Sequence, residues 1–303
     1  MYRPQSGGCD PIGTPVILKH LIRRFAPGFG GALAVLGSAL AQSPGAVGIT
    51  SCAVPPALSD IGVALDRSAA RVDQGNSLTI VAVGSSSTQG VGASAPSLSY
   101  PSRLQEELRD RLPALEIQVL NRGIGGQDVP EELKRLDQDV VVEHPDLVIW
   151  QVGTNAVLRR DDLAADKELI RRGVSLMKED GIDVVLMDLQ YARRVLARPA
   201  WGEMERAIGE IAQNSHVGLF RRFEIMQEWD RTQQLAPAPM VGPDGLHMTD
   251  ASYSCLASQL AEALAWNWWS RGKIAKSSHQ NPDAVSKLSQ PPTPPFSTAL
   301  RPP

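Results

Sequence analysis

Five short segments along the chain are predominantly hydrophobic. The runs cover residues 78–83, 117–120, 147–152, 184–187 and 217–220. Each of the first four ends directly before a glycine, an asparagine or an aspartate. Continuous rather than alternating hydrophobicity is typical of strands that are buried on both faces, as in a parallel sheet. The runs therefore predict a five-stranded parallel sheet.

Between these runs, hydrophobic residues recur at helical spacing. The helical segments cover residues 100–111, 130–142, 163–179, 204–213 and 250–269. In the first of them, Leu104, Leu108 and Leu112 lie four positions apart. Strands that alternate with helices in this way build βαβ units with right-handed crossovers. The predicted fold class is α/β, a three-layer α/β/α sandwich.

The first 41 residues have the features of a leader. Lys19, Arg23 and Arg24 form a basic cluster, residues 28–40 are small and apolar, and residues 39–41 read A-x-A. This order is typical of a secretory signal peptide. We expect cleavage after Ala41 and an exported protein, periplasmic or secreted. The alternative is a membrane anchor, which the glycines and the A-x-A site disfavour, so no stable membrane insertion is expected after cleavage.

Composition divides the remaining chain into three parts. Residues 42–75 form an N-terminal extension, and residues 76–270 contain all the predicted strands and helices. Residues 271–303 are a tail in which proline and serine dominate from Lys276 onward. Such a composition cannot supply a hydrophobic core, so the tail is expected to be disordered.

Charge and cysteine content narrow the function classes. The formal net charge is −3 and only 5% of residues are aromatic, which disfavours nucleic-acid binding. After leader removal two cysteines remain, Cys52 and Cys255. In an exported protein they can form one disulfide between the N-terminal segment and the last helix. The alternative is a pair of buried free thiols.

Candidate chemistry lies in four segments. Three of them follow predicted strands, and the fourth precedes the last helix: residues 84–88 (GSSST), 121–126 (NRGIGG), 153–155 (GTN) and 244–247 (DGLH). Open parallel sheets bind ligands beyond the carboxyl ends of their strands. Hydroxyl, glycine, amide and Asp-x-x-His groups are therefore expected to meet at one edge.

Only one of the five histidines is expected at this edge. His20 lies in the leader, His279 in the tail, and His144 and His216 precede strands at the opposite edge. His247 remains, with Asp244 three residues before it. A carboxylate can fix the tautomer of such a histidine and stabilise its imidazolium form.

A serine hydroxyl needs a base of this kind to act as a nucleophile, and the oxyanion that results needs hydrogen-bond donors. The candidate donors are the N–H of the nucleophile, a glycine N–H of residues 121–126 and the Asn155 amide. The sequence contains no metal-ligand cluster, G-x-G-x-x-G or G-x-x-x-x-G-K-[ST] pattern. No metal, nucleotide or other cofactor is expected.

In order and spacing, these four segments resemble the blocks of the SGNH hydrolases, also called the GDSL family, over residues 78–269. The resemblance implies a flavodoxin-like fold and a Ser-His-Asp triad. It assigns Ser86 as nucleophile, His247 as general base and later acid, and Asp244 as the third member. Gly126, or Gly125 one place away, would share the oxyanion hole with Ser86 and Asn155. Ser85 departs from the family, which usually has aspartate there, so the choice among three adjacent serines rests on register.

The resemblance implies a serine esterase, a carboxylic ester hydrolase acting through an acyl-enzyme. Its partners would be small-molecule or polysaccharide esters, such as small acyl or O-acetyl carbohydrate esters. Three alternatives remain open: an acyltransferase that moves the acyl group to an envelope polysaccharide, a lysophospholipase or lipase-type acylhydrolase, and a binding module without turnover. The first shares the same triad.

Two loops at the same edge are basic. They contain Arg159 and Arg160 after Asn155, and Arg193, Arg194 and Arg198 after the fourth strand. One hypothesis is that they hold an anionic part of the substrate. The alternative is solvated arginines paired with Asp161 or Asp162. Tyr191 and Trp201 flank the second loop, where they could line a sugar or acyl pocket or serve only packing.

Overall fold

The computed structural model describes residues 52–160 and 162–280. The predicted leader lies outside the described residues, as do the chain beyond residue 280 and Asp161. Five parallel strands form one sheet in the order β2-β1-β3-β4-β5. Their bounds are β1 Leu78–Gly84, β2 Ile117–Gly123, β3 Leu147–Gln151, β4 Asp183–Met187 and β5 Gly218–Phe220. The five-stranded parallel sheet that the hydrophobic runs predict is confirmed.

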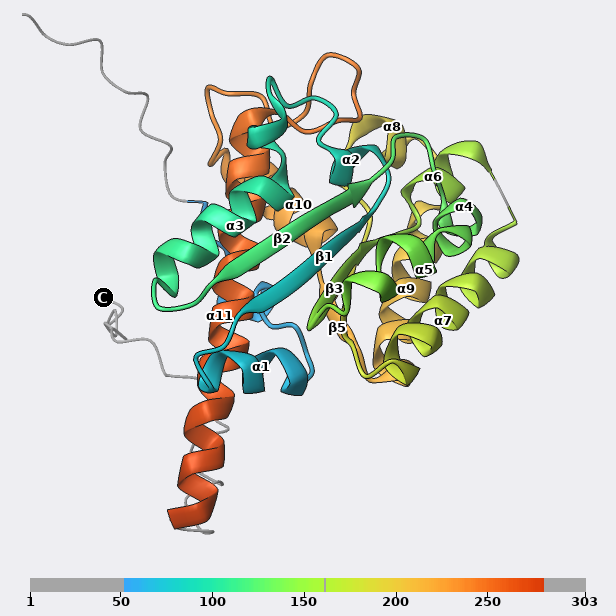
Figure 1. Cartoon of the computed structure of the whole chain (residues 1–303). Helices are drawn as coiled ribbons and strands as arrows, with labels where there is room; N and C mark the ends of the chain where they lie inside the picture. The colour runs from blue at the N-terminus through green and yellow to red at the C-terminus, as the bar shows by residue number, and fades with distance from the viewer. Residues whose placement is uncertain (1–51, 161, 281–303) are drawn as a thin grey trace, which may run out of the picture. The chain divides into compact units, whose positions relative to one another are not determined.

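Helices cover both faces of this sheet (Figure 1). The α-helices are α1 Asp66–Asp73, α2 Ser86–Gln89, α3 Tyr100–Arg111, α4 Val129–Lys134, α5 Leu136–Asp139, α6 Thr154–Arg159, α7 Leu163–Glu179, α8 Arg193–Leu196, α9 Trp201–Ser215, α10 Arg222–Thr232 and α11 Asp250–Gln280. Three short 3-10 helices are η1 Pro56–Leu58, η2 Pro96–Leu98 and η3 Val141–Glu143.

Side chains of each inner strand alternate between two hydrophobic cores. On β1, Ile80 and Ala82 enter the core under α3 and α11, whereas Val81 and Val83 enter the core under α7 and α9. All four are buried. Because a strand directs successive side chains to opposite faces, both faces of the sheet must be covered. The three-layer α/β/α class is therefore confirmed.

Two helical predictions need correction. The single helix expected at residues 130–142 is divided into α4, α5 and η3, with non-helical backbone at Arg135 and Val140. The β-branched run at 140–142 disfavours a continuous helix there. At the other end, the helix expected to stop near 269 continues to Gln280, so the first ten residues assigned to the disordered tail are helical.

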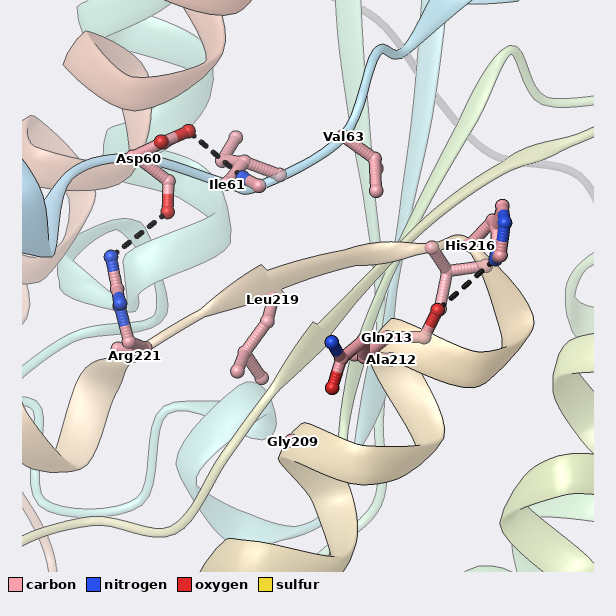
Figure 2. A pocket seen from close by; sticks show the side chains of 11 residues that line it. Asp60, Ile61, Val63, Gly209, Ala212, Gln213, His216, Leu219 and Arg221 are labelled. Atoms are coloured by element: carbon pink, nitrogen blue, oxygen red, sulfur yellow. Dashed lines mark hydrogen bonds between the residues drawn. The ribbon is translucent and has the colours of Figure 1, made fainter.

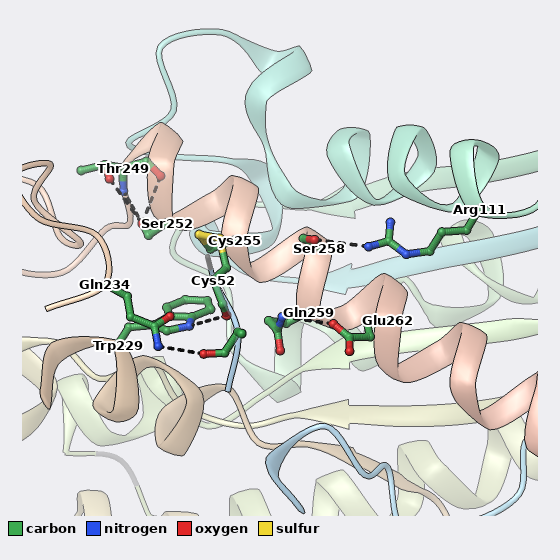
Figure 3. The surroundings of a disulfide bond; sticks show 11 residues. Cys52, Arg111, Trp229, Gln234, Thr249, Ser252, Cys255, Ser258, Gln259 and Glu262 are labelled. Atoms are coloured by element: carbon green, nitrogen blue, oxygen red, sulfur yellow. Dashed lines mark hydrogen bonds between the residues drawn. A yellow bond between two sulfur atoms is a disulfide. The ribbon is translucent and has the colours of Figure 1, made fainter. Parts of the chain in front are cut away.

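The N-terminal extension is part of the fold. Ile61 and Leu65 are buried in the core that α11 covers, and α1 packs against α11. Cys52 and Cys255 form a disulfide with Cα atoms 5.3 Å apart, which joins this extension to α11 (Figure 3). The Trp229 indole donates to the Cys52 carbonyl at 3.0 Å beside it. In the described part of the chain, none of the helices is long and apolar enough to span a bilayer.

Candidate active site

The serine segment turns sharply at the carboxyl end of β1, and Ser86 begins α2 directly after it (Figure 1). Gly84 makes this turn with φ +153°, and a Cβ at that position would lie 2.4 Å from Thr88 Oγ1 and 2.9 Å from Gln151 Cβ. Only glycine fits such a close approach. As the first residue of a helix, Ser86 has a backbone N–H without a partner inside that helix.

Ser86, His247 and Asp244 lie in one hydrogen-bonded line. His247 Nε2 is 2.9 Å from Ser86 Oγ, and His247 Nδ1 is 2.5 Å from Asp244 Oδ2. The other Asp244 oxygen, Oδ1, accepts from the N–H groups of Leu246 and His247. The structure therefore brings together the three residues assigned from the sequence, although Ser86 and His247 are separated by 161 in residue number.

Hydrogen bonds determine the charge of Asp244. Its partial burial works to raise the pKa of the carboxyl, but the N–H groups of Leu246 and His247 and the His247 ring outweigh that effect, and the pKa is lowered. An ionised Asp244 requires a proton on Nδ1 of His247, so Nε2 can accept the Ser86 proton. The arrangement can therefore deprotonate an attacking hydroxyl.

Of the three adjacent serines, only Ser86 has its hydroxyl at His247. The Ser85 hydroxyl donates to Gln151 Oε1 at 2.9 Å, and the Ser87 hydroxyl donates to the same oxygen at 3.0 Å. Both serines are buried, whereas Ser86 is partly exposed. The side-chain geometry thus distinguishes three residues that the sequence separates only by register.

The glycine loop and Asn155 lie beside the serine turn. A Cβ on Gly125 would be 3.9 Å from Ser86 Cβ, but the Gly125 N–H already donates to Gln89 Oε1 at 2.8 Å. Gly126 has φ +79°, and its carbonyl accepts from Arg159. The Asn155 amide donates to the Gln127 carbonyl at 2.7 Å, which leaves its second N–H for another acceptor. Because the Gly125 N–H is already bonded to Gln89, Gly126 is the better candidate for the glycine donor of the oxyanion hole.

The predicted substrate residues have different surroundings. Besides Gly126, Arg159 contacts Glu131 at 3.7 Å, so its acidic neighbour is not Asp162, which instead caps α7. Arg193 and Arg194 are both exposed. The Arg193 guanidinium lies against the Asp244-to-His247 loop, because a Cβ on Gly245 would be 3.3 Å from its Nη2.

The two aromatic candidates pack on a shared residue. Trp201 stacks on Phe223 with ring centroids 4.9 Å apart, and Tyr191 contacts the edge of the same ring at 5.3 Å. Tyr191 also lines an open cavity of about 500 Å³ with Leu58 and residues of α10. Packing explains Trp201, whereas Tyr191 keeps one surface toward this cavity.

Beneath the serine turn lies a buried polar cluster that the sequence pattern did not indicate. Arg222 Nη1 donates to Ser87 Oγ at 2.9 Å, and its Nη2 donates to the Asp188 carbonyl at 2.5 Å. The Asp188 carboxylate accepts from Phe223 N–H and is hydrogen-bonded to Glu205. Two features of the sequence could have indicated this cluster. Asp188 directly follows a strand, and the polar Gln151 lies within an apolar strand.

The carboxyls of Asp188 and Glu205 are hydrogen-bonded to each other, and both have a raised pKa. Burial raises the pKa of both, and the Asp188 carboxylate raises the pKa of Glu205 further. Arg222 and the Phe223 N–H favour the ionised form of Asp188. The protonated form is nevertheless favoured at both carboxyls, and the Asp188 charge favours it further at Glu205.

A separate cavity of about 470 Å³ lies away from these loops (Figure 2). Its lining includes Asp60, Gln213, His216 and Arg221, from the N-terminal extension, the end of α9 and the strand β5 region. His216 precedes β5, at the amino edge of the sheet, as its position in the sequence predicts. None of the residues lining this cavity belongs to the four site segments.

Comparison with known proteins identifies the family to which the chain belongs. Residues 51–267 match the family model of the non-GDSL lipase-like family. An arylesterase of Vibrio mimicus is 27% identical over 150 residues, which is 48% of this chain and 73% of that protein. An acetylxylan esterase of Geobacillus stearothermophilus is 41% identical over 56 residues, which is 18% of this chain and 26% of that protein.

A solved structure shares the fold. It is a two-domain esterase active on acetylated mannans, co-crystallized with mannopentaose. The TM-score is 0.55 at 22% identity, over 67% of this chain. This chain spans about half of that protein, 53% of its length.

Proposed function

Because the chain belongs to the non-GDSL lipase-like family and is a carboxylic ester hydrolase of the SGNH type, we propose that it cleaves small acyl esters. The reaction passes through an acyl-enzyme on Ser86. One observation carries the proposal. His247 Nε2 lies 2.9 Å from Ser86 Oγ while its Nδ1 contacts Asp244. Nucleophile, base and orienting carboxylate are thus within hydrogen-bond reach, as this chemistry requires.

In the first half of the proposed reaction, Ser86 Oγ bonds to the ester carbonyl carbon as its proton passes to His247 Nε2. The carbonyl oxygen becomes an oxyanion, and the N–H groups of Ser86, Gly126 and Asn155 stabilise it. His247 then gives the proton to the leaving alcohol as the ester C–O bond breaks. The acyl group remains on Ser86.

In the second half, His247 takes a proton from water while the water oxygen attacks the acyl carbon. The bond from that carbon to Ser86 Oγ breaks, and the proton returns from His247 to Ser86. Asp244 stabilises the imidazolium at both stages. The products are a carboxylic acid and an alcohol.

We propose O-acetylated carbohydrate as the substrate class. The acetylxylan esterase and the esterase active on acetylated mannans support this choice by their own reported substrates. We also propose that the protein works after export. The basic and apolar leader supports this location, as does the disulfide, because such bonds persist in oxidising compartments.

Serine replacement tests the proposal. We expect Ser86→Ala to lower kcat on p-nitrophenyl acetate and on acetylated xylan by about 10⁴-fold or more. Ser85→Ala and Ser87→Ala are matched controls and should keep turnover far above that of Ser86→Ala, since their hydroxyls bond to Gln151 and not to His247. A fluorophosphonate probe should label wild type at Ser86. Full activity in Ser86→Ala, or labelling at another serine, would refute the assignment.

A further inference from the structure

Gln151 is the last residue of β3, and its side chain is buried directly beneath the serine turn. Its amide oxygen Oε1 accepts from the Ser85 N–H at 3.0 Å, the Ser85 hydroxyl at 2.9 Å and the Ser87 hydroxyl at 3.0 Å. These donors come from the two residues on either side of Ser86. One oxygen therefore holds the chain both before and after the serine that contacts His247.

Chemistry fixes the direction of these hydrogen bonds. The Arg222 guanidinium can only donate, so at 2.9 Å the Ser87 oxygen must accept from it. The Ser87 proton is then directed to Gln151 Oε1, which can only accept. Arg222 is in turn fixed by its bond to the Asp188 carbonyl. The order of donation runs from Arg222 to Ser87 to Gln151, and separately from Ser85 to Gln151.

The fit around Gln151 is close. A Cβ at Gly84 would lie 2.9 Å from Gln151 Cβ and 3.0 Å from Oε1. At position 85, where the GDSL pattern has aspartate, a carboxylate would place an acceptor against the acceptor Oε1. Serine at 85 and glutamine at 151 instead form a donor–acceptor pair. The two residues are thus complementary to each other.

We propose that Gln151 is a positioning residue, which holds Ser86 Oγ in line with His247 by fixing the residues before and after it. The inference rests on the proposed role of Ser86 as nucleophile. Gln151 hydrogen-bonds to Ser85 and Ser87, whereas the hydroxyl of Ser86 contacts His247. Loss of Gln151 is therefore expected to slow attack by Ser86 without changing how the substrate binds, because displacement of a reacting group by about 1 Å can cost about 100-fold in rate.

The test compares Gln151→Leu with Gln151→Glu. Leucine removes the acceptor, whereas glutamate keeps an acceptor oxygen at the same reach. We expect Gln151→Leu to lower kcat on p-nitrophenyl acetate by about 10- to 100-fold with KM within about twofold. The rate of fluorophosphonate labelling should fall by the same factor, and Gln151→Glu should recover most of both.

Gln259→Leu is the matched control. Gln259 is also a buried glutamine, but it lies on α11 and bonds to Ser59 and Glu262 (Figure 3). Its variant should lose thermal stability and keep the wild-type kcat and labelling rate. A Gln151→Leu protein that labels at the wild-type rate, or whose loss glutamate fails to reverse, would overturn the positioning role.

Should Gln151→Leu not fold, the double variant Ser85→Ala/Ser87→Ala tests the same contacts from the other side. It removes both hydroxyl donors and keeps Gln151, and an unchanged kcat and labelling rate would overturn the proposal. Ser86→Ala, measured in parallel, separates the two hypotheses. If that variant stays active, the proposed function is wrong. If it is inactive while the Gln151 and double variants are fully active, only the positioning role is wrong.

Discussion

The two edges of the sheet hold similar polar residues that are arranged differently. At the amino edge, Ser68 donates its hydroxyl to Asp183 at 2.8 Å and accepts from the Trp268 indole at 2.9 Å. At the carboxyl edge, Ser86 contacts His247 at 2.9 Å, and His247 contacts Asp244. Ser68 is fully buried, whereas Ser86 is partly exposed.

This comparison shows what separates a structural serine from a candidate nucleophile. Ser68 bonds directly to a carboxylate, and its hydrogen bonds join α1 and α11 to the sheet. Between Ser86 and the carboxylate lies the His247 imidazole, whose Nε2 can accept the Ser86 proton. The hydroxyls of Ser85 and Ser87, on either side of Ser86, donate to Gln151. The Ser86 hydroxyl contacts His247 instead.

The largest expected effect at the carboxyl edge, after loss of Ser86 itself, concerns Asn155. Removal of one oxyanion donor typically costs about 10²- to 10³-fold in kcat. We expect Asn155→Ala to show this loss on p-nitrophenyl acetate with a small change in KM. Steady-state kinetics measures it, with Asn76→Ala as an exposed control at the other edge. A kcat within threefold of wild type would exclude Asn155 as a donor.

Substitutions at the amino edge should lower the stability of the protein and leave its activity unchanged. The buried Asp146 carboxylate accepts from Arg71 Nε at 2.9 Å and from Thr79 N–H at 3.0 Å. In Asp146→Asn one of these donors would face an amide N–H. We therefore expect the free energy of unfolding to fall by about 1–3 kcal/mol. Urea denaturation measures the change, and kcat should stay unchanged. Glu168→Gln, which removes an exposed pair with Arg171, should cost less than about 0.5 kcal/mol.

A loss of kcat in Asp146→Asn comparable to that in Asn155→Ala would contradict the division between the edges. It would mean that the sheet transmits changes from one edge to the other. The urea midpoint and the kcat of the same preparation therefore have to be compared.

The raised pKa values of Asp188 and Glu205 predict a pH dependence of stability. The pKa of both carboxyls is higher in the folded state than in the unfolded state. Their contribution to the free energy of unfolding is therefore complete at a pH below the unfolded-state pKa values, and it is lost as pH rises through the folded-state pKa values. Within that window one proton changes the unfolding free energy by about 1.4 kcal/mol per pH unit. Glu205→Gln mimics the protonated acid and should flatten this decline.

Urea denaturation between pH 6 and 9 measures this slope. Some decline should persist in Glu205→Gln, because burial also raises the pKa of Glu132 to about 8. Glu210→Gln, on the same helix α9, serves as a control that keeps the wild-type slope. Equal slopes in wild type and Glu205→Gln would show that folding does not raise the pKa of Glu205.

The smallest effect is expected at the exposed arginines. Charge reversal in Arg193→Glu and Arg194→Glu should lower kcat/KM for an anionic ester by about 2- to 5-fold relative to a neutral one, in line with the strength of exposed ion pairs. The comparison requires matched esters at low salt. Equal losses on both esters would remove the hypothesis that these arginines hold an anionic group.

Sequence patterns predicted the layers of the fold because continuous hydrophobicity reports burial on both faces of a strand. They predicted α3 and α7 with the bounds observed, Tyr100–Arg111 and Leu163–Glu179. The pattern missed α10, although Met226 and Trp229 are buried three positions apart on it. A short helix with charged residues between its core positions carries a weak periodic signal.

Candidate residues could be proposed from segments that follow strands or precede the last helix, but not from side chains beneath them. Position along the chain indicates Asn155 and His247, and the family resemblance selects Ser86 among three serines. Gln151 and Arg222 come from different elements, β3 and α10, and meet only in three dimensions at Ser87. Periodicity gives the face of an element on which a residue lies, but no partner on another element.

The disulfide closes a covalent ring between cysteines with a sequence separation of 203. Ser86, Asn155, Asp244 and His247 all lie inside this ring, together with every strand of the sheet. A protease that cuts a surface loop within it, such as the peptide bond after exposed Arg159, would leave two fragments still linked. The nicked protein should migrate as one band on a non-reducing gel and as two after reduction.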